Sequence, residues 1–233
     1  MSMEKLSVPI AIVIAGGLIA GALYYSNIKT PANAVADNTA NNAVNSASEM
    51  APVSSSDHIL GNPNAELIIV EYSDTECPYC KVFHNTMKRV MNEYGQDGKV
   101  AWVYRHFPIE QLHLKARKEA EATECAYDLG GNEKFWEYIN ALYDLTNSND
   151  SLDPAELPKI AKTVGLDVEA FNACLSSNKN AEKIETSYQG AIKAGARGTP
   201  HSIIVSKDGT LTPVDGGAIP YENLKEIIDA LLK

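Results

Sequence analysis

Positive charge is scarce in this sequence. Its 233 residues include 20 lysines and arginines against 30 aspartates and glutamates, which gives a formal net charge of −10 with neutral histidines. No run of basic residues stands out along the chain. Proteins that bind nucleic acids through the phosphate backbone need a basic surface. The composition therefore argues against nucleic-acid binding by this route, and we expect no nucleic-acid partner.

Cysteine and histidine are also few, with four cysteines and five histidines. A structural zinc site needs four ligands, usually a second Cys-x-x-Cys or a histidine pair beside the first. The chain has one such motif, Cys77-Pro78-Tyr79-Cys80, whereas Cys125 and Cys174 stand alone. No paired spacing occurs among the histidines, which are His58, His84, His106, His113 and His201. Half of a zinc site and an inert disulfide remain alternatives, but the motif favours a redox-active pair, and we expect neither a metal nor a cofactor.

The residues around the motif predict a strand followed directly by a helix. Residues 67–72 form an apolar, β-branched run typical of a buried strand, and residues 73–76 form a polar turn. Residues 80–94 then show helical spacing of apolar side chains. Cys77 is thus expected at a helix N-terminus, where the helix dipole and free backbone N–H groups stabilise a thiolate and lower the pKa of the cysteine.

The first 56 residues differ from the rest of the chain. Residues 8–25 form an almost entirely apolar run between Lys5 and Lys29. Its length is at the lower limit for a membrane-spanning helix and also fits a secretory signal. We expect residues 1–26 to form a transmembrane anchor, or alternatively a cleaved signal peptide. Residues 27–56, rich in Ala, Asn and Ser, are expected as a flexible linker, and residues 57–233 as one folded domain.

Both interpretations of the N-terminus, anchor and signal peptide, predict that the domain is exported. An even number of cysteines agrees with an oxidising compartment, so we expect a membrane-anchored protein of the cell envelope with an extracytoplasmic catalytic domain. Secretion or periplasmic release after signal cleavage is the alternative. The same reasoning favours a structural disulfide between Cys125 and Cys174, and two unpaired buried thiols are the alternative.

The order of predicted elements indicates an α/β fold. Strands are expected at residues 67–72 and 99–105, and a hairpin at 202–206 and 211–214. A block of helices separates the two pairs, at residues 112–129, 132–145, 153–165, 167–175 and 180–194, and a last helix covers 221–232. Without that block, a thioredoxin-like topology remains. We therefore predict a thioredoxin-like fold with an inserted helical domain at about residues 111–195.

Several separate stretches of the domain occur in the order found in one known family. They are Gly61-Asn62-Pro63, Glu71-Tyr72-Ser73-Asp74, Cys77-Pro78-Tyr79-Cys80, Tyr104-Arg105-His106-Phe107-Pro108, Glu124-Cys125-Ala126, Phe135-Trp136 and Gly198-Thr199-Pro200. Through them residues 57–233 resemble the DsbA-like thiol:disulfide oxidoreductases. The N-terminal 56 residues do not take part in this resemblance.

The resemblance implies roles for the matching residues. Cys77 corresponds to the exposed nucleophile and Cys80 to the buried resolving cysteine. Pro200 lies where thioredoxin folds place a cis-proline opposite the active disulfide, and Thr199 would offer its backbone to an extended substrate. Substrate contacts are also expected from Pro78 and Tyr79 in the motif. An ordinary turn proline at the start of a strand is the alternative for Pro200.

Three other residues near the motif have titratable side chains. Glu71 interrupts an apolar strand, and the resemblance implies a buried acid that relays protons for the resolving cysteine; a side chain that reaches water is the alternative. Glu76 is expected to be a solvated turn residue. His84 is expected to be an ordinary surface or partly buried helix residue.

The expected activity is thiol:disulfide exchange with exported, cysteine-containing proteins, most simply as a disulfide donor. The resemblance also implies a membrane quinone-linked oxidase as redox partner. A reductase or isomerase of the same fold remains an alternative, and so does a non-redox, chaperone-like binding module.

Overall fold

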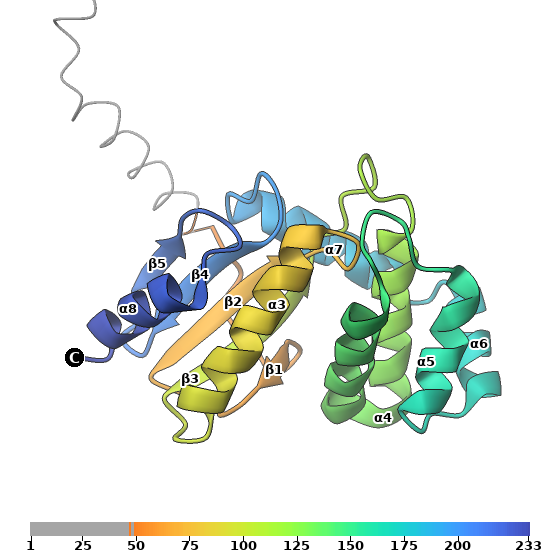
Figure 1. The fold of residues 1–233 in the computed structure, drawn as a ribbon, viewed down its shortest axis with the longest axis horizontal. Coiled ribbons are helices and arrows are strands. Elements are labelled where there is room, and N and C mark those ends of the chain that lie inside the picture. Colours follow the sequence, from red (N-terminus) through yellow and green to blue (C-terminus); the bar gives the residue numbers. More distant parts are fainter. Residues whose placement is uncertain (1–46, 48) are drawn as a thin grey trace, which may run out of the picture. The chain divides into compact units, whose positions relative to one another are not determined.

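The computed structural model describes residue 47 and residues 49–233 (Figure 1). The expected anchor or signal, and residues 27–46 and 48 of the expected linker, lie outside the described residues. Within the described part of the chain, no helix has both the length and the apolar character needed to cross a membrane.

A five-stranded mixed sheet forms the centre of the domain, with the strand order β1-β3-β2-β4-β5. The strands are β1 (His58–Leu60), β2 (Leu67–Ser73), β3 (Val100–His106), β4 (His201–Ser206) and β5 (Leu211–Val214). β2 and β3 run parallel, and β1, β4 and β5 are each antiparallel to their neighbours. The predicted parallel pair and the predicted hairpin are confirmed. β1, with three residues, was not predicted.

Both faces of the sheet are covered because its central strands are apolar on both sides. Leu67 and Ile69 of β2 pack with α3 (Pro78–Val90) and α8 (Tyr221–Leu231) on one face. Val70 and Tyr72, which alternate with them, pack on the other face with α7 (Ala181–Lys193). Figure 1 shows α3 lying across the front of the sheet, with a short π-helical turn, η2 (Met91–Gly95), after it.

The helical insertion lies between β3 and β4. It consists of α4 (Ala116–Leu145), the 3-10 turn η3 (Pro154–Glu156), α5 (Leu157–Thr163), α6 (Val168–Ser177) and α7. The sequence predicts two helices separated at Gly130-Gly131, whereas α4 continues through a kink at Gly131, which has φ 72° and ψ −166°. Such a conformation is accessible mainly to glycine, so the kink lies where the break was expected.

A second hydrophobic core holds the insertion together, built from α4, α5 and α6. A disulfide between Cys125 of α4 and Cys174 of α6 crosses this core, and both cysteines are buried. The predicted pairing of these two cysteines is confirmed.

Residues just before β1 contact the domain. Met50 is buried against the face of the sheet that α7 covers. The Arg105 guanidinium donates hydrogen bonds to the carbonyl oxygens of Ala51 and Pro52. These contacts place residues 50–52 of the expected linker against the sheet.

Candidate redox site

The two cysteines of the motif lie at the junction of β2 and α3. Cys77 is the N-cap residue of α3 and Pro78 occupies its first turn, where a missing backbone N–H costs nothing. Both cysteines are free thiols here. Cys80 is fully buried, and Cys77 keeps 5% of its surface exposed. Cys77 is therefore less accessible than the exposed nucleophile that the resemblance implied, because the segment around Thr199 covers it.

The surroundings of the two thiols separate their acidities. A hydrogen bond from Cys80 lowers the pKa of Cys77 to about 6, with further help from Thr199 and from the backbone N–H groups of Cys80 and Tyr79. Burial opposes this effect on Cys77. Burial, together with the neighbouring Cys77, raises the pKa of Cys80 well above its usual range. At neutral pH the pair thus holds one thiolate, on Cys77, and one thiol, on Cys80.

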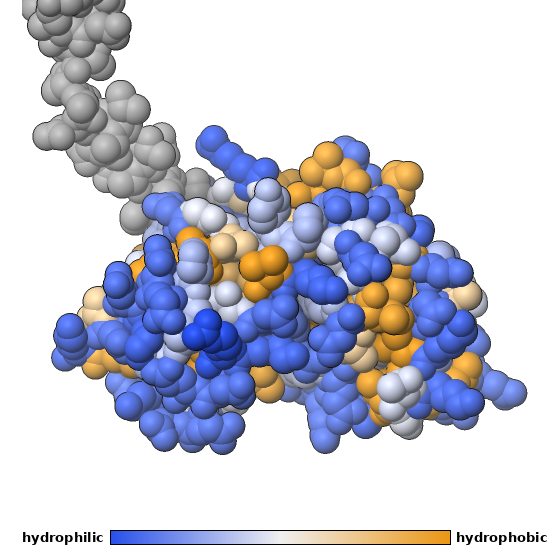
Figure 2. Space-filling model, viewed as in Figure 1, coloured by the Kyte–Doolittle hydropathy of each residue, from blue (hydrophilic) through white to orange (hydrophobic). Residues whose placement is uncertain are grey.

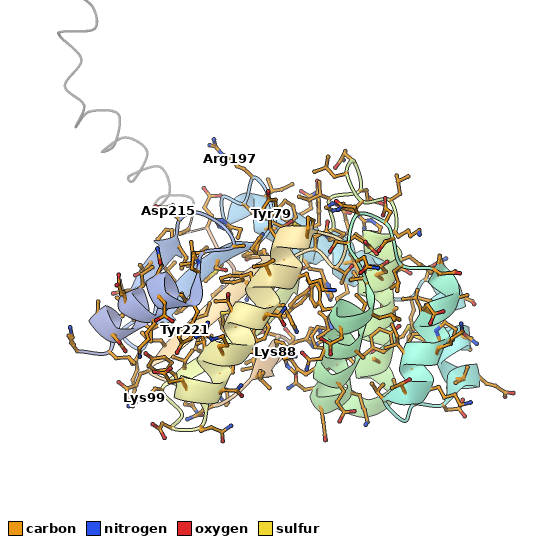
Figure 3. All side chains as sticks on the ribbon, in the orientation of Figure 1. Tyr79, Lys88, Lys99, Arg197, Asp215 and Tyr221 are labelled. Atoms are coloured by element: carbon orange, nitrogen blue, oxygen red, sulfur yellow. A yellow bond between two sulfur atoms is a disulfide. The ribbon has the colours of Figure 1, made fainter. Side chains whose placement is uncertain are left out.

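The segment before β4 forms the opposite wall of the site. The Thr199–Pro200 peptide bond is cis, and the Cys77 thiol lies 3.4 Å from the Thr199 carbonyl oxygen. Pro200 is buried, whereas Tyr79, between the two cysteines, is 67% exposed. Figure 3 shows Tyr79 at the first turn of α3, at the same end of the view as Arg197, which precedes β4.

Apolar side chains are exposed around this end of α3. Tyr79 and Val82 are exposed on the first turns of the helix, and Leu112 and Leu114 on the loop before α4. Figure 2 shows a mostly hydrophilic face on which hydrophobic residues gather over the start of α3 and over the loops above it. The arrangement offers an apolar surface beside the thiols.

Glu71 lies in the middle of the sheet and is fully buried, so its side chain does not reach water. One carboxylate oxygen accepts a hydrogen bond of 2.9 Å from the Trp102 indole N–H, and the other has no partner. Burial raises the pKa of Glu71 to about 7. The Glu71 carboxylate also contributes to the raised pKa of Cys80. A group with this pKa can take up or release a proton at neutral pH.

The sequence shows Asp74 in a polar turn and at the end of the stretch Glu71-Tyr72-Ser73-Asp74, and indicates no role for its side chain. Its backbone N–H donates to the Cys80 sulfur at 3.4 Å. Its buried carboxylate accepts hydrogen bonds from the His113 ring at 2.9 Å and from the Ile109 N–H at 2.8 Å. Asp74 thereby ties the active-site turn to the loop that follows β3.

Two expectations about nearby residues are wrong. Glu76, expected to be solvated, is fully buried, because a loop from the helical insertion covers it. His84, expected at or near the surface, is buried between the rings of Trp102 and Tyr143. Burial lowers the pKa of His84 to about 4, so its ring is neutral at physiological pH. Distant segments decide the burial of Glu76, and the local sequence holds no signal of it. His84, in contrast, lies at helical spacing with Cys80, Phe83 and Met87 on the buried face of α3, which the sequence pattern could have indicated.

The described residues include one group with the donor set of a metal site. His58, His106 and Glu124 are all buried, and their ligand atoms lie within 4.8 Å of one another. Both rings approach the same Glu124 oxygen, at 2.8 and 3.0 Å, and Lys183 pairs with the other oxygen at 2.5 Å. Because Lys183 already balances the carboxylate, we interpret the group as a buried salt-bridge cluster that joins β1, β3 and α4.

Comparison with known proteins places this chain in a family. A family model described as Thioredoxin matches residues 53–230. Among curated proteins, the chain is 33% identical over 145 residues to the Na(+)/H(+) antiporter NhaA 3 of Salinispora tropica, covering 62% of this chain and 21% of that protein. It is 36% identical over 116 residues to the Na(+)/H(+) antiporter NhaA 1 of Mycolicibacterium vanbaalenii, covering 50% and 18%. The chain thus spans about a fifth of the length of these curated relatives.

Solved structures similar to this fold cover most of both chains. Pseudomonas aeruginosa DsbA2 has a TM-score of 0.65 and 27% identity, covering 77% of this chain and 97% of its own. Wolbachia pipientis alpha-DsbA1 has a TM-score of 0.67 and 27% identity, covering 80% and 96%. BdbD of Bacillus subtilis, at 20% identity, has a TM-score of 0.67 and covers 76% and 92%, which supports the fold alone.

Proposed function

Because this chain belongs to the thioredoxin family, in its DsbA-like branch, we propose that it is an oxidoreductase that donates disulfides to exported proteins through Cys77 and Cys80. The observation that carries the proposal is the contrast between the two thiols. Cys77 has its pKa lowered to about 6 at the start of α3, and Cys80 is a fully buried thiol directly behind it. One reactive thiolate next to one protected thiol is what disulfide exchange requires.

The donor reaction begins with the oxidised Cys77–Cys80 pair. A substrate thiolate attacks the Cys77 sulfur, the Cys77–Cys80 bond breaks, and Cys80 leaves and takes up a proton. A second substrate thiolate then attacks the substrate sulfur of the mixed disulfide, and Cys77 leaves as a thiolate. The substrate loses two electrons and gains a disulfide, and the protein becomes a dithiol with one proton on Cys80 and the other released to solvent.

The low pKa of Cys77 supports the donor direction. A stable thiolate is a good leaving group, and its stability favours the reduced form of the protein, which makes the disulfide form oxidising. A reductase or isomerase uses the same two sulfurs in the opposite direction and needs a more stable disulfide. We therefore place these activities second, and a chaperone-like module without redox chemistry third.

Three neighbouring groups complete the proposed mechanism. Thr199 and cis-Pro200 would align an extended substrate by strand-like pairing, with Pro78 and Tyr79 contacting it from α3. Glu71 would supply or remove the proton of Cys80, since its pKa of about 7 suits transfer in both directions at neutral pH.

The proposed location is the cell envelope, with the domain outside the cytoplasm. The Cys125–Cys174 disulfide supports it, since such bonds persist in oxidising compartments, and so does the apolar run at residues 8–25. There, exported cysteine-containing proteins would be the substrates and a membrane quinone-linked oxidase would reoxidise the pair. The same proposal includes the N-terminal anchor or signal peptide at residues 1–26, the linker at residues 27–56 and the domain that follows it.

Replacing each active-site cysteine tests the mechanism. We expect Cys77→Ser to abolish the oxidation of a dithiol peptide, because the attacked sulfur is gone. Cys80→Ala keeps Cys77, whose thiolate can attack a disulfide-bonded peptide; one peptide thiol leaves, and the mixed disulfide should accumulate, seen by mass spectrometry, because no Cys80 thiol is left to resolve it. Peptide oxidation that survives Cys77→Ser would show that the mechanism is wrong.

A further inference from the structure

Glu76, the residue before Cys77, forms hydrogen bonds to distant parts of the chain. Its backbone N–H donates to the Asp74 carboxylate at 2.9 Å, and its carbonyl oxygen accepts from the Asn149 N–H at 2.7 Å. Its side-chain Oε1 accepts from the Thr146 hydroxyl at 3.2 Å and from the Leu152 N–H at 3.4 Å. Three of these four bonds join the active-site turn to one loop of the helical insertion.

That loop, residues 146–152, connects α4 to η3. Three successive residues in it, Ser148, Asn149 and Asp150, have positive φ of 66°, 55° and 60°. Non-glycine residues adopt this conformation at a cost, so surrounding contacts must hold the loop in place. The Lys81 ammonium donates a hydrogen bond to the Thr146 carbonyl oxygen. The Asp150 carboxylate accepts hydrogen bonds from the backbone N–H groups of Leu114 and Lys115.

The remaining oxygen of Glu76 has no such bond. Glu76 Oε2 is buried without a hydrogen-bond partner, and so is Oε2 of Glu119, in the first turn of α4. An orphaned buried carboxylate oxygen is costly. The side chains of Glu76 and Glu119 are within hydrogen-bonding reach of each other, so two ionised carboxylates there would also repel. A proton held between them satisfies both oxygens at once, in the way that paired carboxylates share a proton in other buried sites.

The electrostatics agree with this arrangement. Burial, followed by the hydrogen bond to Glu76, raises the pKa of Glu119 to about 9. The negative charge of Asp74 in the active-site turn adds to this effect on Glu119, and a hydrogen bond with Thr75 opposes it. Glu119 in turn contributes to the raised pKa of Tyr138 in α4. Two further groups are nearby: the His113 ring hydrogen-bonds to the Asp74 carboxylate, and the Lys81 ammonium donates to the Thr146 carbonyl oxygen.

We propose that Glu76 and Glu119 share one buried proton, which holds the start of α4 and the loop 146–152 against the turn that carries Cys77. Glu76 is then a positioning residue for the nucleophile rather than a catalytic one. Loss of the proton would leave two negative charges buried side by side, which would separate α4 from the turn and free the loop. Only the role assigned to Cys77 rests on the proposed function; the shared proton is testable without turnover.

The first test is a titration of the unaltered full chain. We would follow the glutamate side-chain carboxyl carbons by NMR from pH 4 to pH 10. One glutamate besides Glu71 should remain protonated at pH 7 and ionise near pH 9, and its signal should disappear in Glu119→Gln. If every glutamate other than Glu71 is ionised by pH 7, the shared proton does not exist.

The second test measures whether the proton holds the loop. We expect the hydrogen-exchange protection of the Asn149 and Leu152 amides, corrected for intrinsic exchange, to fall about tenfold or more between pH 7 and pH 10. Glu119→Gln should abolish that fall, because its amide N–H is a permanent donor to Glu76. Equal protection at both pH values in the unaltered chain would contradict the proposal.

Glu121→Gln is the matched control. Glu121 is also buried on α4, but it pairs with the Lys118 ammonium at 2.8 Å. This variant should keep the pH dependence of the unaltered chain. If Glu121→Gln also abolishes the fall in amide protection, the effect comes from a general loosening of α4, and the proposal fails. Cys77→Ser should leave the carboxyl titration unchanged. If the unaltered chain shows this titration but does not oxidise a dithiol peptide, the proposed function fails and the shared proton stands.

Discussion

The properties of single residues around the motif depend on their surroundings, through burial and hydrogen bonds, more than on their chemical type. Cys77 and Cys80 have the same side chain, yet the pKa of Cys77 is lowered and that of Cys80 is raised. Glu71 has its pKa raised to about 7 in the middle of the sheet. The sequence identified all three residues, because a strand, a turn and a helix N-terminus are local features. It did not indicate the contacts of Asp74 and Glu76 with loops that lie 35 or more positions further along the chain, and it gave His84 too little burial.

Glu71 makes a prediction for stability against pH. The pKa of Glu71 in the folded protein is about 7, above the ordinary 4.5, so the folded state holds this proton more tightly than the unfolded state. The unfolding free energy therefore decreases as pH rises from 4.5 to 7. Glu71→Gln removes this loss. We expect the variant to be more stable than the parent by about 3 kcal/mol at pH 8 and unchanged at pH 4, measured by urea unfolding.

Exposed Glu66, just before the same strand, provides the control. Glu66→Gln should leave the pH dependence as in the parent. If Glu71→Gln gives no stabilisation at pH 8, the pKa of Glu71 in the folded protein is not raised, and its assignment as a proton relay at neutral pH fails.

Secondary-structure elements show where sequence patterns are sufficient. The apolar and β-branched runs predicted β2, β3 and β4, because buried strands have a clear pattern, and a turn followed by residues 211–214 predicted β5 as the second strand of a hairpin. β1 has only three residues and depends on pairing with β3, so it left no pattern of its own. In α4 the glycine pair predicted a break, whereas packing on both sides of Gly131 keeps the two halves together as a kinked helix.

The Cys125–Cys174 disulfide makes a prediction for the helical insertion. It closes a loop of 49 residues between α4 and α6, and the loop-entropy estimate for this size is about 4 kcal/mol. We expect Cys125→Ala with Cys174→Ala to lower the unfolding free energy by that order, measured by guanidinium unfolding of the oxidised protein. The pKa of Cys77 should not change, since the second core lies apart from the thiols.

A double variant as stable as the parent would mean that the bond does not restrain the unfolded chain. The single variant Cys174→Ala, which leaves Cys125 unpaired, controls for the lost side-chain packing.

At the scale of the whole molecule, the thioredoxin-like fold and its helical insertion follow from the order of the elements, and the family comparison confirms both. The contact between the insertion and the active-site turn does not follow from that order. It depends on the loop 146–152 meeting Glu76, which no periodicity indicates. The insertion is therefore a structural support of the redox site as well as a cover.

The reduction potential of the Cys77–Cys80 couple tests the central claim most directly. It would be measured on the full chain by equilibration in glutathione buffers, with the free thiols counted by alkylation and mass spectrometry. A disulfide donor with a stabilised Cys77 thiolate should have a potential near about −120 mV. A value near about −270 mV would match a thioredoxin-like reductant and would contradict the donor function.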